Sequence, residues 1–289
     1  MKPASHAESA INHDRPKPAA DVTVTPRHAA WEFPSDVPRW WFGGSPARTR
    51  TLDVYTLLIP DNERYYIRRL KRSVDRIADP AQKEELAAFF RQEALHGYAH
   101  NAYWENLRRD GIRTERFTRV VNAFLYKIVE PILPQRMHLA NIAAIEHVNA
   151  YFGHIFLDRQ LLRDADPRLR RLFEWHFAEE IEHKAVAFDA LEALYPGYLT
   201  RAAGAALTFP LFYLILFAGT AWMLAGQGEL LRRRTLRDLY GFWIGDGVLR
   251  DSLRYIGRYL RPSFHPWDED DYPLARRFFA TFETNPEPD

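Results

Sequence analysis

The sequence contains no cysteine among its 289 residues. This absence excludes disulfide bonds, thiolate metal ligands and a cysteine nucleophile, and it is compatible with a reducing compartment. Any metal site in the chain must therefore be built from histidine and carboxylate side chains.

The chain also lacks a net charge of either sign. Its 39 lysines and arginines balance 38 aspartates and glutamates, for a formal charge of +1. Such a chain has no long-range field to attract nucleic acid. Residues 1–26 contain no central apolar run of the kind that marks a secretory signal. We therefore expect a cytoplasmic protein that does not bind nucleic acid.

Alternating strand patterns and internal repeats are missing as well. Hydrophobic residues at 47% and aromatic residues at 14% are typical of a folded globular protein, and long helical stretches fill most of the chain, so we predict an all-α fold. We expect a flexible tail over residues 1–30 and a non-helical aromatic and proline-rich strap over 31–59. A helical bundle should cover 60–197, and an apolar helix with further C-terminal helices should cover 198–289.

Proline, aspartate and glycine mark the expected helix ends. Pro60 suits the first turn of a helix, while Asp79-Pro80 and Asp166-Pro167 offer an N-cap followed by proline. Gly111 suits a helix end. The expected helices of the bundle cover about 60–78, 80–110, 114–130, 135–163 and 167–195, and those after it cover about 235–261 and 272–282.

Two Glu-x-x-His pairs carry the chemistry of the sequence. Glu93 and His96 form one pair, and Glu180 and His183 form the other, each in the middle of an expected long helix. A separation of three residues puts both side chains on one helix face, where a carboxylate oxygen and an imidazole nitrogen can reach one ion. One such pair is weak support, because it arises easily on a solvated helix face.

A glutamate precedes each pair on another expected helix. Glu63 lies thirty residues before Glu93, and Glu146 lies thirty-four residues before Glu180, within an apolar stretch. This order matches ferritin-like four-helix bundles that hold two metal ions between carboxylates. We therefore expect a ferritin-like bundle with additional C-terminal helices. The predicted metal ligands and catalytic residues are Glu63, Glu93, His96, Glu146, Glu180 and His183.

Oxygen and nitrogen ligands of this kind favour two iron ions, with manganese as an alternative. Four carboxylates would neutralise two divalent ions. Gln92, Glu179 and Asp189 are candidates for hydrogen bonds that orient the ligand histidines. Four further histidines lie on the same helices, and of these we expect His100 to line the site and His147 and His176 to face elsewhere; the fourth is His154.

Several longer motifs contain these residues. They are Pro60-x-x-Glu63-Arg64-Tyr65-Tyr66, Gln92-Glu93-x-x-His96-x-x-x-His100, Ala144-Ile145-Glu146-His147 and Trp175-His176-x-x-Glu179-Glu180-Ile181-Glu182-His183-Lys184-x-x-x-Phe188-Asp189. With them, residues 30–260 resemble the bacterial proteins called predicted metal-dependent hydrolases, of the ferritin-like superfamily. Those relatives often have Phe-Pro-x-Gly-Glu before the first helix, where this chain has Ile59-Pro60-Asp61-Asn62-Glu63. The missing glycine alters a turn there but removes no ligand.

The ligand set alone is compatible with more than one reaction. By analogy with ferritin-like bundles, we expect a non-haem di-iron oxidoreductase that activates O₂ and oxidises a small apolar, lipid-like substrate. No dinucleotide or flavin motif is visible, so electrons would come from a separate donor. The first alternative is a metal-dependent hydrolase that uses the same two ions. The second is a non-catalytic metal-binding protein.

Residues 202–228 form an apolar segment without a charged residue. The segment exceeds the roughly 20 residues that cross a bilayer. Arginine precedes it at Arg201 and follows it at Arg232, Arg233 and Arg234, which favours a segment that dips into one leaflet over a clean crossing. We therefore expect peripheral or monotopic contact with the inner membrane. A core helix or the interface of a homodimer is the alternative.

Overall fold

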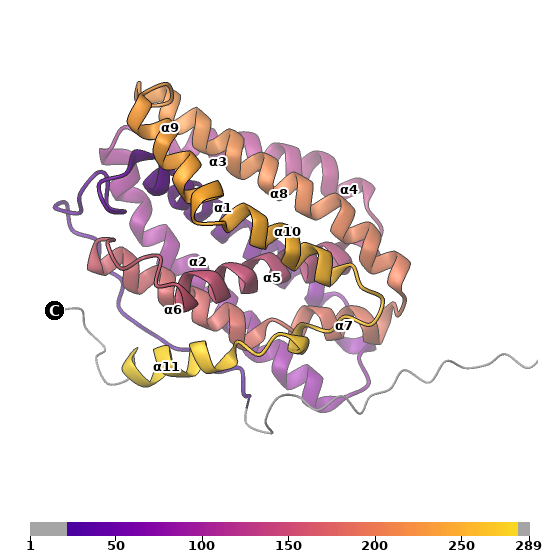
Figure 1. Ribbon diagram of the computed structural model, residues 1–289. Coiled ribbons are helices and arrows are strands. Elements are labelled where there is room, and N and C mark those ends of the chain that lie inside the picture. The colour runs from indigo at the N-terminus through magenta and orange to yellow at the C-terminus, as the bar shows by residue number, and fades with distance from the viewer. Residues whose placement is uncertain (1–21, 283–289) are drawn as a thin grey trace, which may run out of the picture.

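The computed structural model describes residues 22–282, and the regular structure within that range is helical (Figure 1). Its β-type pairing is limited to an isolated bridge between Phe42 and Ala165. The predicted all-α fold is therefore confirmed for the described part of the chain. Residues 1–21 of the predicted tail lie outside that part.

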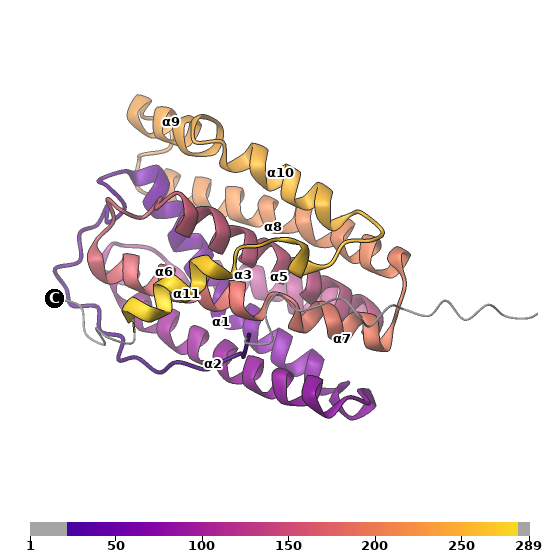
Figure 2. The same ribbon diagram turned by 60° about the horizontal axis from the view of Figure 1, so that its bottom comes forward.

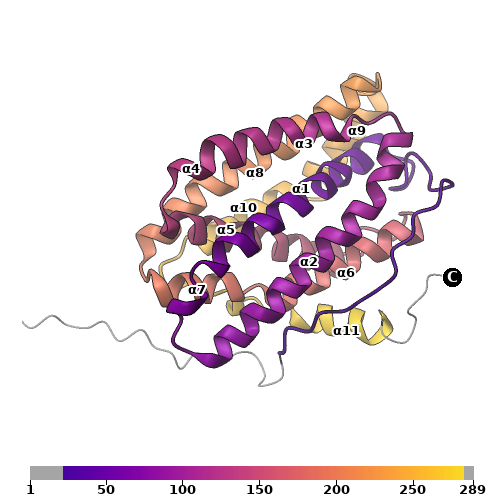
Figure 3. The same ribbon diagram turned by 180° about the vertical axis from the view of Figure 1, so that it is seen from behind.

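Long helices surround a common core. They are α1 (Pro46–Lys71), α2 (Pro80–Arg109), α5 (Gln135–Asp158) and α6 (Pro167–His183). Helix α1 packs against α2 and α5 packs against α6, while contacts between α2 and α6 and between α1 and α5 close the bundle. Figure 3 shows α1 and α2 side by side. The ferritin-like character of this bundle stays a prediction.

Two of the long helices begin where the sequence predicts. The Asp79 side chain accepts a hydrogen bond from the Ala81 N–H at 2.9 Å, and Asp166 accepts one from the Arg168 N–H at 3.0 Å. A proline follows each cap, where its missing N–H costs no helical hydrogen bond. Gly111, with φ of +81°, follows the end of α2.

The first helix begins earlier than predicted. It begins at Pro46, after Ser45 as N-cap, and continues through Pro60 to Lys71. The helical turn before Pro60 is buried, so packing of this turn outweighs the roughly 3 kcal/mol that an internal proline costs. The non-helical strap predicted for residues 31–59 therefore ends at Ser45. The turn expected just before Glu63 is absent, because that segment is the middle of α1.

Several predicted helices are divided or shorter. The third predicted helix is divided into α3 (Thr114–Asn122), a π-helical segment (Ala123–Val129) and α4 (Glu130–Ile132). The fifth is divided into α6 and α7 (Val186–Leu194). The helix predicted for about 235–261 is divided into α9 (Arg233–Tyr240), a π-helical segment (Gly241–Gly245) and α10 (Val248–Tyr259). Helix α5 ends at Asp158 instead of residue 163, shortly before Gln160, whose φ is +49°. Gly247, whose φ is +73°, lies immediately before α10 and separates it from α9 and the π-helical segment that follows α9.

The apolar segment forms α8 (Tyr198–Gly226), which runs along one edge of the molecule beside α3 and α4 (Figures 1 and 3). Its inner side packs against α5 and α1. An added Cβ at Gly204 would lie 2.5 Å from Ala140 Cβ, and one at Gly153 of α5 would lie 2.4 Å from the Phe177 carbonyl oxygen of α6. Both glycines therefore permit close contact between helix backbones.

The N-terminal segment, residues 22–45, runs along the outside of the bundle towards α1 (Figure 2). The ring of Trp31 lies 5.0 Å from that of Trp175 on α6. The guanidinium of Arg27 stacks 3.4 Å from the Phe279 ring on α11 (Tyr272–Phe282). The segment thus joins the last helix to the helix that carries Glu180 and His183.

Candidate metal centre

All six predicted ligands meet in the core of the bundle. Their carboxylates and imidazoles come from α1, α2, α5 and α6, and each residue is at most 2% exposed. His183 Nε2 lies 3.1 Å from Glu146 Oε2, 3.3 Å from Glu93 Oε1 and 3.0 Å from Glu180 Oε2. The i, i+3 spacing of each Glu-x-x-His pair therefore turns both of its side chains inward. Their role as metal ligands stays a prediction.

The cluster divides into two groups whose donor atoms lie within 4.8 Å of one another. One group contains Glu63, His96, His176 and Glu180, and the other contains Glu93, Glu180 and His183. Glu180 belongs to both groups: its Oε1 lies 3.2 Å from His176 Nε2, and its Oε2 lies 3.0 Å from His183 Nε2. A carboxylate in this position could bridge two ions.

His176 faces the cluster, contrary to the expectation that it faces elsewhere. Besides its contact with Glu180, its Nε2 lies 3.1 Å from the hydroxyl of Tyr55, which donates a hydrogen bond to Asn149 Oδ1. The signal was present, because His176 precedes Glu180 by four residues and therefore shares its helix face. Considering only three-residue spacings excluded it.

The buried polar atoms of the cluster test whether the residues fit a metal site. Both carboxylate oxygens of Glu63, Glu93 and Glu146 lack a hydrogen-bond partner, as does His96 Nδ1. A protonated His183 near Glu93 and Glu146 can offset only one negative charge, and buried carboxylates left without compensation cost several kcal/mol. Divalent cations would satisfy these atoms, and oxygen and imidazole donors are the ligands that such ions take. The donor set therefore fits a metal site.

Electrostatics within the cluster agree with this conclusion. Burial raises the pKa of Glu63 and Glu93 well above the usual range, and repulsion from the neighbouring carboxylates adds to the shift. Burial lowers the pKa of His96 and His176. Burial also disfavours charge on His183, but Glu180 and Glu146 outweigh it and raise the pKa of His183 to about 10. Without metal ions, some of the carboxylates and imidazoles in the cluster must stay protonated to offset its negative charge.

Hydrogen bonds orient both ligand histidines. Gln92 Oε1 lies 2.9 Å from His183 Nδ1, and Glu179 Oε2 lies 3.0 Å from His96 Nε2. In each of these histidines, one ring nitrogen can donate a hydrogen bond to this oxygen while the other ring nitrogen faces the cluster. The predicted contacts of Gln92 and Glu179 with these histidines are thus present, and the ligand role of the histidines stays a prediction. Asp189 was predicted wrongly, because its Oδ1 contacts His265 Nε2 at 2.9 Å.

The remaining histidines lie outside the two groups. His100 Nδ1 contacts the hydroxyl of Thr56 at 3.2 Å, and its ring lies 4.9 Å from that of His176, so it borders the cluster. His147 Nε2 donates to the Tyr255 carbonyl at 3.0 Å and faces away, as predicted. His154 is directed to Asp271, at 3.6 Å.

Comparison with known proteins places the chain in a family. The model of the family described as "Predicted metal-dependent hydrolase" matches residues 25–270, which is most of the chain. No curated protein and no solved structure matches it. The family match contradicts our main expectation of a di-iron oxygenase or oxidase and favours the hydrolase that we held as the alternative. O₂ and an electron donor as partners stay untested predictions. Together with the buried histidine and glutamate cluster, the match shows that this chain belongs to the family of predicted metal-dependent hydrolases.

Proposed function

We propose that the protein is a hydrolase that uses two divalent metal ions held between α1, α2, α5 and α6. The observation that carries the proposal is the buried cluster of carboxylate oxygens without hydrogen-bond partners, in a chain of a metal-dependent hydrolase family. Glu63, His96 and His176 would hold one ion, and Glu146 and His183 the other. Glu93 and Glu180 would be shared between them.

Two such ions would supply Lewis-acid activation of water and of a substrate carbonyl. The chain supplies the rest of the site. Four carboxylates balance the charge of two divalent ions in a core of low dielectric. The rings of Phe89 and Trp175 lie 4.8 Å from His183 and 4.9 Å from His96, respectively, and restrict access of bulk water. Iron or manganese is the proposed occupant, because carboxylate-rich sites favour these ions over zinc.

Metal analysis and anaerobic hydrolysis test this proposal. Protein produced with iron and manganese available should contain two ions per chain, and it should hydrolyse p-nitrophenyl esters without O₂. Glu146→Gln should reduce both metal content and turnover, because it removes a ligand charge at constant shape. Glu105→Gln on the exposed side of α2 is the control. Less than about one ion per chain, or turnover that requires O₂, would refute the proposal.

We also propose that α8 contacts a membrane surface. Within the described residues, α8 is the helix that is long and apolar enough to cross a bilayer, yet only 33% of its most apolar stretch is buried. A helix of the protein core would be mostly buried. The exposed residues of α8 are Tyr198, Leu199, Ala203, Ala206, Pro210, Leu214, Phe217, Ala218, Ala225 and Gly226, and among these side chains only that of Tyr198 carries a polar group.

The neighbouring segment extends this apolar surface. Val120, Phe124, Ile128 and Ile132 repeat every four residues from α3 to α4, and all four are exposed. Exposed Arg119 and Lys127 lie on the same segment, and exposed Arg232, Arg233 and Arg234 follow the C-terminal end of α8. Basic side chains beside an apolar face are the composition that binds anionic membranes from one side.

Co-sedimentation with vesicles tests the membrane contact. The protein should sediment with phosphatidylglycerol vesicles, and Ile128→Asp together with Ile132→Asp should release it. Tyr98→Asp is the control, since Tyr98 is 66% exposed on α2. The alternative outcome is a protein that does not bind vesicles and forms a dimer, which Ile128→Asp and Ile132→Asp dissociate. In that case the apolar face is a dimer interface and the membrane proposal is wrong.

A further inference from the structure

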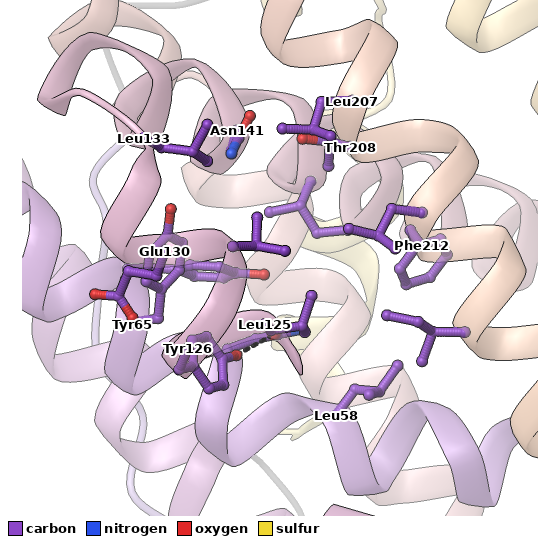
Figure 4. A pocket seen from close by; sticks show the side chains of 16 residues that line it. Leu58, Tyr65, Leu125, Tyr126, Glu130, Leu133, Asn141, Leu207, Thr208 and Phe212 are labelled. Carbon is purple, nitrogen blue, oxygen red and sulfur yellow. Dashed lines mark hydrogen bonds between the residues drawn. The ribbon is translucent and has the colours of Figure 1, made fainter. Parts of the chain in front are cut away.

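An apolar pocket of about 100 Å³ lies between α1, α5, α8 and the π-helical segment Ala123–Val129. Figure 4 shows its side chains converging from these elements, with Leu58 of α1, Leu125 of the π-helical segment and Phe212 of α8 among them. The few polar groups include Asn62, whose Oδ1 accepts a hydrogen bond from the Tyr126 hydroxyl at 2.5 Å. Glu130, Asn141 and Thr208 also line the pocket, and the remaining lining residues are aliphatic or aromatic.

The pocket borders the proposed metal centre. Asn62 and Ile145 line it, and they immediately precede the ligand residues Glu63 and Glu146 on α1 and α5. Tyr66 also lines the pocket, and it follows Glu63 by three residues on α1, so the two side chains share one helix face. Of the pocket-lining residues, Tyr66 is therefore the one that we place next to the ligand cluster.

The mouth of the pocket opens towards the apolar surface described above. The aliphatic lining residues that are only half-buried include Leu125, Val129 and Leu133 on one side and Leu207 and Leu211 of α8 on the other, so we infer that the mouth lies between them. Beyond the mouth, the exposed rim carries Phe124, Ile128, Ile132 and Leu214. Water forms no hydrogen bonds with these side chains, whereas a hydrocarbon chain that moves from a lipid layer across this rim into the pocket stays in apolar surroundings.

We propose that this pocket holds the acyl chain of a lipid ester taken from a bilayer, with the ester group directed past Tyr66 to the metal centre. The inference rests on the proposed hydrolase function. Water would add to the acyl carbon, the acyl–oxygen bond would break, and a fatty acid and an alcohol would leave. A volume of about 100 Å³ corresponds to roughly seven to ten water-sized groups. We therefore expect a preference for chains of about that many carbons inside the pocket.

Two substitutions on α8 provide a matched test. Leu211 lines the pocket, whereas Leu214 lies one turn away and is 64% exposed. Leu211→Trp should fill the pocket and weaken binding of the fluorescent probe 11-(dansylamino)undecanoate at least tenfold, and Leu214→Trp should not. Leu125→Trp fills the pocket from the opposite wall and should have the same effect as Leu211→Trp. Equal binding by all variants, or an equal loss in Leu214→Trp, would overturn the inference.

Probe binding and ester cleavage test the pocket and the hydrolase function separately. The wild-type protein should cleave p-nitrophenyl octanoate faster than the acetate, and the two pocket substitutions should remove that preference while acetate cleavage persists. Cleavage of both esters at equal rates without probe binding would overturn the pocket and keep the hydrolase. Saturable probe binding that the pocket substitutions abolish, without cleavage of any ester, would keep the pocket and overturn the hydrolase.

A separate experiment tests whether the lipid enters the pocket from a bilayer. Leu214→Arg changes the rim without entering the pocket, so it should slow transfer of the probe from phosphatidylglycerol vesicles and leave binding of the dissolved probe unchanged. Equal transfer by the wild type and Leu214→Arg would assign the pocket to a dissolved ester and overturn delivery from the bilayer.

Discussion

The ligand cluster should make the metal-free protein less stable as the pH rises above neutrality. Burial and neighbouring carboxylates raise the pKa of Glu63 and Glu93, and the carboxylates around His183 outweigh burial and raise its pKa to about 10. In the unfolded chain, glutamate and histidine titrate near 4.3 and 6.5. Above about pH 7, the folded metal-free protein therefore holds protons that the unfolded chain has lost.

The sign and the size of the effect follow from linkage. A group whose pKa is raised by folding stabilises the protein below its unfolded pKa, and it loses that contribution as the pH approaches its folded pKa. Burial lowers the pKa of His96 and His176, so both are neutral in either state above pH 7 and do not contribute. The cluster titrates as a unit. One extra proton would lower the free energy of unfolding by about 2 kcal/mol between pH 7 and pH 8.5.

Glu93→Gln isolates one of these protons. The amide has the shape of the protonated carboxyl group and stays neutral, so the metal-free variant should lose less stability with rising pH than the wild type. Between pH 7 and pH 8.5, the stability of the variant relative to that of the wild type should increase by about 2 kcal/mol. Urea unfolding of chelator-treated protein, followed by circular dichroism at several pH values, measures this difference. Glu105→Gln, on the same helix and exposed, should leave the slope unchanged.

Metal loading should reverse the trend. Ions bind the deprotonated ligands, so the stability of the loaded wild type should rise over the same pH range, and Glu93→Gln should lose that rise. A metal-free wild type whose stability is constant or increases between pH 7 and pH 8.5 would refute the electrostatic account of the cluster. Equal slopes for the wild type and Glu93→Gln would exclude Glu93 as a site of the extra proton.

Three further substitutions test individual contacts. His176→Ala should lower the metal content towards one ion per chain, whereas His147→Ala should leave it unchanged; metal analysis of both variants decides whether His176 is a ligand. Gln92→Ala should weaken metal affinity about 10- to 100-fold in a chelator competition assay, because His183 loses the partner that orients it. Gly153→Ala should destabilise the protein by about 1–3 kcal/mol in urea unfolding, because the added methyl group meets the α6 backbone. Gly226→Ala, which meets nothing within 4 Å, should not.

The convergence of the six residues could be predicted from the sequence because helix periodicity pairs Glu93 with His96 and Glu180 with His183, and the order of the glutamates matches that of a four-helix metal bundle. Glu93 and His96, like Glu180 and His183, share a helix face at a spacing of three residues. His176 obeys the same geometry at a spacing of four, so its omission was a limit of the pattern used. Pro60 is a different case. Its local preference favours a helix start, and only the burial of the preceding turn, which no local pattern reveals, keeps it inside α1.

The reaction and the pocket were beyond such reasoning for separate physical reasons. Carboxylate and imidazole ligands around two ions are compatible with O₂ chemistry and with hydrolysis alike, so Glu63 and its partners could not distinguish them. The pocket joins Leu58, Leu125, Ile145 and Leu211 from four elements. Their proximity depends on how α8 packs against α1 and α5, and each of them alone resembles an ordinary core residue.

The contacts around the ligand histidines cross between two helices. Gln92 precedes Glu93 on α2 but contacts His183 on α6, and Glu179 precedes Glu180 on α6 but contacts His96 on α2. Each helix therefore orients a histidine of the other, so a shift of α2 against α6 would disturb both histidines at once.

The N-terminal segment reinforces this arrangement. Arg27 donates to Glu182 at 2.9 Å and to Glu179 at 3.4 Å, and Gln92 Nε2 donates to the Thr25 carbonyl at 3.1 Å. The segment thus contacts the residues that support both ligand histidines, on α2 and on α6. If His96 and His183 bind metal as proposed, the contribution of Arg27 to metal affinity should exceed what a surface ion pair provides, because Arg27 contacts Glu179 and Glu182, and through them the residues that position both histidines.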